Sequence, residues 1–146
     1  MPAGRAGMAR SPALSTALVL LRGPLGAGKT TFSRHLLQAL GVQGRIKSPT
    51  YALMESYRVD RGGQPLDIAH FDFYRFQDPQ EWEDAGFRDV FAAPGLKLCE
   101  WPEQVGSLMP LPDLSVWLRP AGGEAREVSW QAHTAVGEAL VHALPD

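Results

Sequence analysis

The residues with the clearest chemical potential form one short run, Gly23-Pro24-Leu25-Gly26-Ala27-Gly28-Lys29-Thr30. The run has the pattern G-x-x-x-x-G-K-T, which is typical of a phosphate-binding loop, the P-loop. Glycines let the backbone wrap around a phosphate with successive N–H groups pointing inward, and a following helix adds the partial positive charge of its N-terminus. The sequence therefore predicts that ATP phosphates bind at Gly26, Ala27, Gly28, Lys29, Thr30 and Thr31.

Two side chains of this run have expected chemical roles. Lys29 should reach the β- and γ-phosphates, and the Thr30 hydroxyl should ligate Mg²⁺, the predicted cofactor. The alternative is a glycine-rich turn that fits the pattern by chance. An apolar run over 17–21 precedes the motif and a helical pattern over 30–40 follows it, which is the strand–turn–helix context that a P-loop requires.

Two acidic residues follow apolar runs that read as strands. Asp72 comes after 68–71 and Glu100 after 96–99. Mg-nucleotide chemistry uses one carboxylate at the metal and another to orient the attacking water, although a strand-terminal acid can also cap a helix or face water. We predict that both acids are catalytic together with Lys29 and that both belong to the metal site with Thr30. Which of the two acids contacts the metal directly stays open.

Three further positions carry weaker signals. Ser48 and Thr50 flank Pro49 in a loop that either senses the γ-phosphate and Mg²⁺ like a switch or is a turn fixed by proline. Trp101 follows Glu100 and either contacts the nucleotide or a partner, or is an ordinary packed aromatic. His70 should share a strand face with Asp72, so we expect it to hydrogen-bond that carboxylate.

The elements around these residues predict an α/β protein. Strand patterns outnumber helical crossovers, so the prediction is a P-loop NTPase-like three-layer fold with a mixed parallel and antiparallel sheet flanked by helices. At 146 residues the chain fits one domain, expected over 17–146 after a disordered leader over 1–16. The expected strands are 17–21, 51–59, 65–71, 96–100, 114–118 and 126–130; helices are expected over 30–40, from Asp78 and over 134–144.

Composition narrows the class of protein. A net charge of −2 argues against a dedicated nucleic-acid binder. The single cysteine, Cys99, cannot form an internal disulfide and lies in an apolar run, which predicts a buried thiol in a reducing compartment. No apolar run approaches the ~20 residues that a membrane span needs, so we expect a cytoplasmic location and no membrane partner.

Four motifs in this order, 23–34, 47–51, 70–75 and 100–103, resemble the TsaE (YjeE) family of bacterial P-loop ATPases. The resemblance covers roughly 18–130. It implies an ATP hydrolase, slow by itself, that is required for multi-turnover formation of the threonylcarbamoyl group on adenosine 37 of ANN-decoding tRNAs. It also implies action with TsaD and TsaB, with tRNA contacted only indirectly. By the same resemblance Asp72 is the Walker-B-like acid, Glu100 serves metal binding and hydrolysis, and Thr50 lies in the switch-like loop.

The chain departs from the family pattern in two places. Pro24 stands where the family usually has Asp, which removes one N–H from the loop. Family members usually carry a further helix and strand before the P-loop strand, and these supply some contacts to the base, so adenine recognition stays open here. The alternative functions are a small-molecule P-loop kinase and a non-catalytic nucleotide-gated adaptor. No arginine finger can be assigned; Arg75 and Arg126 are candidates.

Overall fold

The computed structural model describes residues 11–47, 49 and 52–143. It contains six strands and short to medium helices in the order η1 (Pro12–Thr16), β1 (Leu18–Arg22), α2 (Lys29–Leu40), β2 (Met54–Arg61), β3 (Gln64–Asp72), α3 (Pro79–Asp84), α4 (Phe87–Ala92), β4 (Leu96–Glu100), η2 (Pro102–Gln104), η3 (Gly106–Leu108), β5 (Leu114–Pro120), β6 (Arg126–Ala132) and α5 (Ala135–His142).

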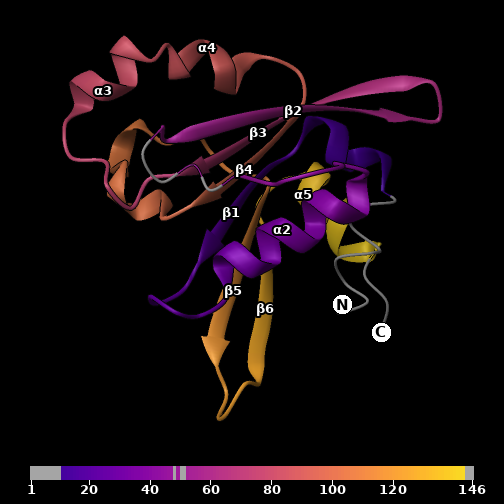
Figure 1. Ribbon diagram of the computed structural model, residues 1–146, viewed down its shortest axis with the longest axis vertical. Helices are drawn as coiled ribbons and strands as arrows, with labels where there is room; N and C mark the ends of the chain where they lie inside the picture. Colours follow the sequence, from indigo (N-terminus) through magenta and orange to yellow (C-terminus); the bar gives the residue numbers. More distant parts are fainter. Residues whose placement is uncertain (1–10, 48, 50–51, 144–146) are drawn as a thin grey trace.

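All six strands join one mixed sheet in the order β2-β3-β4-β1-β5-β6 (Figure 1). The four central strands, β3, β4, β1 and β5, run parallel, whereas the edge strands β2 and β6 are each antiparallel to their hairpin partner. The predicted fold class is thereby confirmed. Because parallel strands end at one edge of the sheet, the loops after β1, β3 and β4 meet there.

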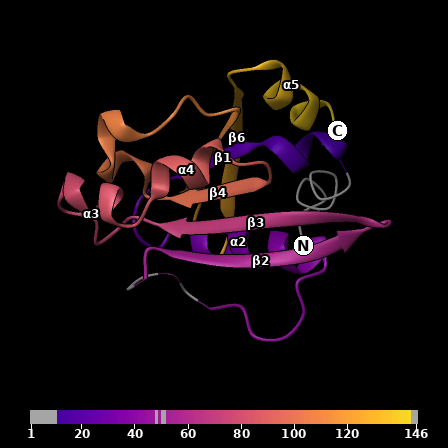
Figure 2. The same cartoon turned by 90° about the horizontal axis from the view of Figure 1, so that it is seen from above.

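Helices cover both faces of the sheet. Helix α2 buries its apolar side, including Phe32, Leu36 and Leu37, against one face. Helices α3 and α4 and the aromatic cluster of Phe71 and Phe87 cover the other face, as Figure 2 shows from above. Among the described residues no helix is long and apolar enough to cross a membrane.

Local signals in the sequence explain most element boundaries. Asp78 caps α3 by accepting the Gln80 N–H at 2.9 Å, and a left-handed Gly86 separates α3 from α4. Thr134 caps α5 by accepting the Gly137 N–H. These boundaries match the expected ones within a residue or two.

The expected leader over 1–16 is wrong for the part that the structure describes. Residues 12–16 form the 3-10 turn η1, which Ser11 caps by accepting the Ala13 N–H. Leu14 of this turn is fully buried, and α5 packs on η1. A short apolar anchor thus orders a segment whose small and proline-rich composition suggested disorder; residues 1–10 lie outside the described part.

Candidate nucleotide-binding site

The ends of three neighbouring strands bring the predicted site residues together. Strand β4 lies between β1 and β3, with Glu100 in register with Leu21 on one side and with Asp72 on the other. The P-loop leaves the end of β1 and leads into α2, which begins at Lys29. Glu100 and Asp72 therefore lie at the same edge of the sheet as the P-loop, and both are buried.

Two positions in the loop need glycine for identifiable reasons. Gly23 has φ +148°, and a Cβ there would lie 2.3 Å from the Leu118 carbonyl oxygen. Gly28 has φ +100°, a left-handed conformation that L side chains rarely adopt. The backbone can therefore turn tightly from β1 into α2 and leave the first N–H groups of the helix available for phosphate oxygens.

Glu100 is the centre of the hydrogen-bond network at this edge. Its Oε1 accepts the Thr30 hydroxyl at 2.9 Å, and its Oε2 accepts the Ser33 hydroxyl at 3.2 Å. The His70 Nε2 lies 2.7 Å from the same Oε2, and both side chains are 2% exposed. The carboxylate is thus fixed by two donors from α2 and by one group from β3.

His70 does not pair with Asp72 in the way we expected. His70 lies in register with Leu98 of β4, and Asp72 lies in register with Glu100. The histidine therefore reaches diagonally across to the acid of the adjacent strand, Glu100, rather than along its own strand to Asp72. Asp72 instead accepts the Tyr74 N–H at 3.0 Å, which holds the chain where it leaves β3.

The Lys29 ammonium is directed toward the start of the P-loop. It donates to the carbonyl oxygens of Gly23 and Pro24, the latter at 3.1 Å. Burial lowers the pKa of Lys29, while the carboxylates of Glu103, Glu100 and Asp72 act in the opposite direction. The site therefore holds a desolvated cation that gains from any added negative charge, such as a phosphate.

Trp101 covers this lysine. The ammonium nitrogen lies 3.7 Å from the centroid of the indole ring, close enough for a cation–π interaction. Trp101 has φ +57°, which is rare for a large residue, and its ring contacts Tyr74 with the ring centroids 4.9 Å apart. The left-handed turn after β4 thus directs Glu100 toward Thr30 and Trp101 toward Lys29.

The donor set at this edge fits Mg²⁺. Among the described residues no group of three or more His, Cys, Asp or Glu could hold a metal. Mg²⁺ bound with nucleotide needs only one or two protein oxygens, because phosphates and waters supply the remainder. The Thr30 hydroxyl and the carboxylates of Glu100 and Asp72 are hard oxygen ligands of the right kind.

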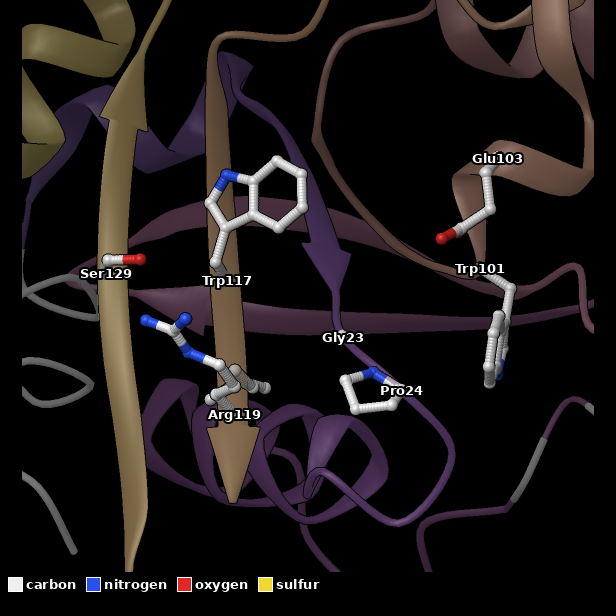
Figure 3. A pocket seen from close by; sticks show the side chains of 8 residues that line it. Gly23, Pro24, Trp101, Glu103, Trp117, Arg119 and Ser129 are labelled. Atoms are coloured by element: carbon white, nitrogen blue, oxygen red, sulfur yellow. The ribbon is translucent and has the colours of Figure 1, made fainter. Parts of the chain in front are cut away.

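In the described part of the chain, cavities adjoin the P-loop at three places. A cavity of about 250 Å³ lies over 25–31 and is bounded by Glu100, Trp101 and Arg126. A cavity of about 360 Å³ lies between α2 and the β5–β6 hairpin. The third, about 630 Å³, lies on the opposite face of the sheet, where Figure 3 shows Trp117 on β5 and Ser129 on β6 across from Pro24, Trp101 and Glu103.

The structure brings together the predicted P-loop residues, Asp72, Glu100 and Trp101, whereas Ser48 and Thr50 lie outside the described residues. The structure adds contacts from two further residues to this site. Ser33 binds Glu100, and its position three residues after Thr30 on one helix face was the available signal. Arg126, one of the two candidates for an arginine finger, donates from β6 to the Gly26 carbonyl at 3.3 Å, whereas no local pattern indicated this contact with the loop backbone.

Comparisons with known proteins agree with this geometry. Residues 4–128 match the family model described as "Threonylcarbamoyl adenosine biosynthesis protein TsaE". The tRNA threonylcarbamoyladenosine biosynthesis protein TsaE of Haemophilus influenzae is 41% identical over 87% of this chain and 77% of its own length. The protein of the same name from Bacillus subtilis is 36% identical over 82% and 70%. The crystal structure of Bacillus subtilis YdiB superposes with a TM-score of 0.72 and 27% identity, covering 95% of this chain and 82% of YdiB.

Proposed function

The chain belongs to the TsaE family of tRNA threonylcarbamoyladenosine biosynthesis proteins, and from this premise we propose that it is a Mg²⁺-dependent ATPase of that pathway. It would act in the cytoplasm with TsaD and TsaB and allow the transferase to turn over repeatedly. The family role and a P-loop nucleotide-binding fold are the starting point. Hydrolysis, the metal and the two partners are the proposal.

One observation carries the proposal, which is the 2.9 Å hydrogen bond from Thr30 to Glu100. In P-loop NTPases the Ser/Thr of the motif and a strand-terminal acid hold Mg²⁺. Glu100 makes that contact with Thr30, so we propose that Glu100 is the acid on the metal side. Asp72, one strand further along the sheet, is then the candidate for orienting the attacking water.

Different residues of the chain have different roles in the proposed reaction. The Gly28 turn and the N-terminus of α2 bind phosphate oxygens, and Lys29 exchanges its two carbonyl partners for the β- and γ-phosphates. Ser33 and His70 hold Glu100 in one orientation, which keeps the Thr30 oxygen in place. Mg²⁺, when bound, supplies charge neutralisation at the phosphates.

The test is a reconstituted reaction that contains TsaB, TsaD, excess substrate and tRNA, with this protein, with Lys29→Ala or with neither. We expect modified tRNA to exceed the amount of TsaD only with the unchanged protein, and ATP hydrolysis to require Mg²⁺. Equal yields in all three mixtures would contradict the proposal. Phosphate transfer to a small acceptor would indicate a kinase, and tight ATP binding without turnover would indicate an adaptor.

A further inference from the structure

The large cavity, about 630 Å³, lies on the face of β5 and β6 opposite α2 and is separate from the phosphate cavity over 25–31. It touches the P-loop only at Gly23 and Pro24, where the chain leaves β1. Among the described residues, Trp101 alone lines both cavities. The volume is that of a site for a small organic molecule. Phosphates bound over 26–31 therefore leave the large cavity open to a different ligand.

Trp117 presents a large aromatic surface to this cavity. It lies on β5, next to the central strand β1, and yet it is 46% exposed. The guanidinium of Arg22, its register partner on β1, lies 5.3 Å from the centroid of the indole ring. A cation–π contact of this kind holds the ring in place. An exposed aromatic ring that is held in place is typical of a binding site rather than of a packed core.

Polar side chains lie on both sides of the two indoles that line the cavity. Arg119 and Ser129 lie on the β5–β6 side, and Glu103 lies across from them on the loop after β4, as Figure 3 shows. Arg119 donates to Glu127 at 3.0 Å, but these two side chains are 68% and 62% exposed. Exposed ion pairs contribute little to stability, so Arg119 can exchange its partner for a phosphate at little cost.

We propose that the large cavity binds one unpaired nucleotide, with its base against Trp117 and its phosphate on Arg119. Proteins recognise unpaired bases by stacking them on aromatic rings and by hydrogen bonds to their edges. Glu103 supplies an acceptor and Ser129 a hydroxyl for those edges. One carboxylate is too few for a bare Ca²⁺, and charged walls do not suit a lipid chain. This site is additional to the ATP site and does not depend on ATP hydrolysis.

Two sources supply such a nucleotide, a free mononucleotide and a loop of RNA. Because the chain has a net charge of −2, we expect a local site for one nucleotide rather than a groove that follows many phosphates. The probes are 5′-AMP, measured by calorimetry, and fluorescently labelled hexaadenylate RNA, measured by anisotropy. Ribose 5-phosphate is the control without a base. Saturating Mg²⁺ and inorganic tripolyphosphate occupy the P-loop in every mixture.

Substitutions of Trp117 and Arg119 test the two contacts. Trp117 does not line the cavity between α2 and the β5–β6 hairpin, so its variants report on the large cavity. We expect Trp117→Leu to weaken binding of 5′-AMP and of the RNA by at least about fivefold, and Trp117→Phe, which keeps a ring, by less than about twofold. Arg119→Ala should weaken both by about fivefold or more and reduce the salt dependence of binding.

Arg58→Ala is the matched control for Arg119→Ala. Arg58 on β2 is also an exposed arginine, 69% against 68%, and is also paired with an exposed carboxylate, that of Asp67. It lies at the other end of the sheet, so its replacement should leave binding of both probes unchanged. Circular dichroism verifies that each variant is folded, and Arg119→Ala keeps the test decisive if Trp117→Leu fails to fold.

Three results would overturn the proposal. These are no binding of either probe to the unchanged protein, equal affinities for 5′-AMP and ribose 5-phosphate, and unchanged affinities in folded Trp117→Leu and Arg119→Ala. Tighter binding of the RNA than of 5′-AMP would support the site and identify RNA as the source, whereas equal affinities would identify the free nucleotide. Since no measurement involves hydrolysis, failure of this proposal is distinguishable from failure of the proposed ATPase function.

Discussion

Replacing Glu100 by glutamine keeps the shape of the side chain at the centre of the site and removes its charge. The carboxylate accepts the hydroxyls of Thr30 and Ser33 and contacts His70 Nε2. Glutamine retains one oxygen, which can still accept from Thr30. Its amide group then replaces Oε2 and faces Ser33 and His70 as a donor instead of an acceptor.

The two neighbours respond differently to this change. Ser33 can accept from the amide and turn its single hydroxyl hydrogen to the Lys29 carbonyl oxygen, which lies 3.0 Å from its Oγ. His70 must accept at Nε2, which moves its proton to Nδ1, a buried atom without a hydrogen-bond partner among the described residues. Hydrogen bonds to a charged group are worth about 1.5–3 kcal/mol and neutral ones about 0.5–1.5 kcal/mol. We therefore expect the free energy of unfolding to fall by about 1–2 kcal/mol and Tm by about 3–8 °C.

The effect on hydrolysis should be much larger than the effect on binding. The P-loop backbone and Lys29 still bind the phosphates, so ATP affinity should fall by less than about tenfold. Loss of the charge beside Thr30 should lower kcat by about 100-fold or more, the range found for groups that act directly in the chemical step. Calorimetric ATP binding, single-turnover phosphate release and thermal unfolding measure the three quantities.

Asp72→Asn is the matched comparison, because Asp72 lies in register with Glu100 on the next strand and accepts a backbone N–H from Tyr74. If Glu100→Gln lowers ATP affinity and kcat by the same factor, Glu100 is not specific to the chemical step. If Glu100→Gln leaves kcat unchanged while Asp72→Asn abolishes it, Glu100 has no part in hydrolysis and the role assigned to it here is wrong.

Three further predictions concern Lys29 and Cys99. Lys29→Ala should lower ATP affinity by about 100-fold or more, since charge-assisted hydrogen bonds to phosphate are worth about 1.5–3 kcal/mol each; calorimetry measures this, and unchanged affinity would remove Lys29 from the site. Burial lowers the pKa of Lys29, so between that lowered pKa and 10.5 the unfolded chain binds more protons and stability rises with pH. Urea unfolding of the nucleotide-free protein measures its free energy of unfolding at about pH 8 and about pH 10. This free energy should rise more between the two pH values than that of Lys29→Met does, and equal rises in the two proteins would contradict the prediction. Burial raises the pKa of Cys99 well above its usual value, so its thiol should resist alkylation in the native protein and react in denaturant; labelling followed by mass spectrometry detects either result.

The sequence was informative wherever a local rule decides the structure. Residues 96–100 form β4 as predicted, because a run this short that follows a glycine fits a buried strand better than a helix. The strands over 114–118 and 126–130, which pair as a hairpin, and the helix that begins after Asp78 depend on neighbours in the chain and were also predicted. The positions of Asp72 and Glu100 at one edge followed from the rule that parallel strands end together.

The remaining features depend on contacts between elements that are distant in the sequence. Pairing of His70 with Glu100 depends on the register between β3 and β4, which no single-strand pattern contains. Burial of Leu14 depends on α5, which lies more than 100 residues later. Arg126 reaches Gly26 because only β5 separates its strand, the edge strand β6, from β1, which leads into the P-loop.

The P-loop pattern accounts for only one side of the site, and two consecutive residues after β4 supply much of the other. Glu100 accepts from Thr30, and Trp101 covers the ammonium of Lys29, so the two P-loop side chains with expected chemistry are held by one dipeptide. The left-handed conformation of Trp101 makes this arrangement possible, because an extended backbone would direct successive side chains to opposite faces of the sheet. Trp101 also forms a wall of the large cavity on the other face. One side chain thus connects the large cavity with the lysine that must release its carbonyl partners before it can bind phosphate.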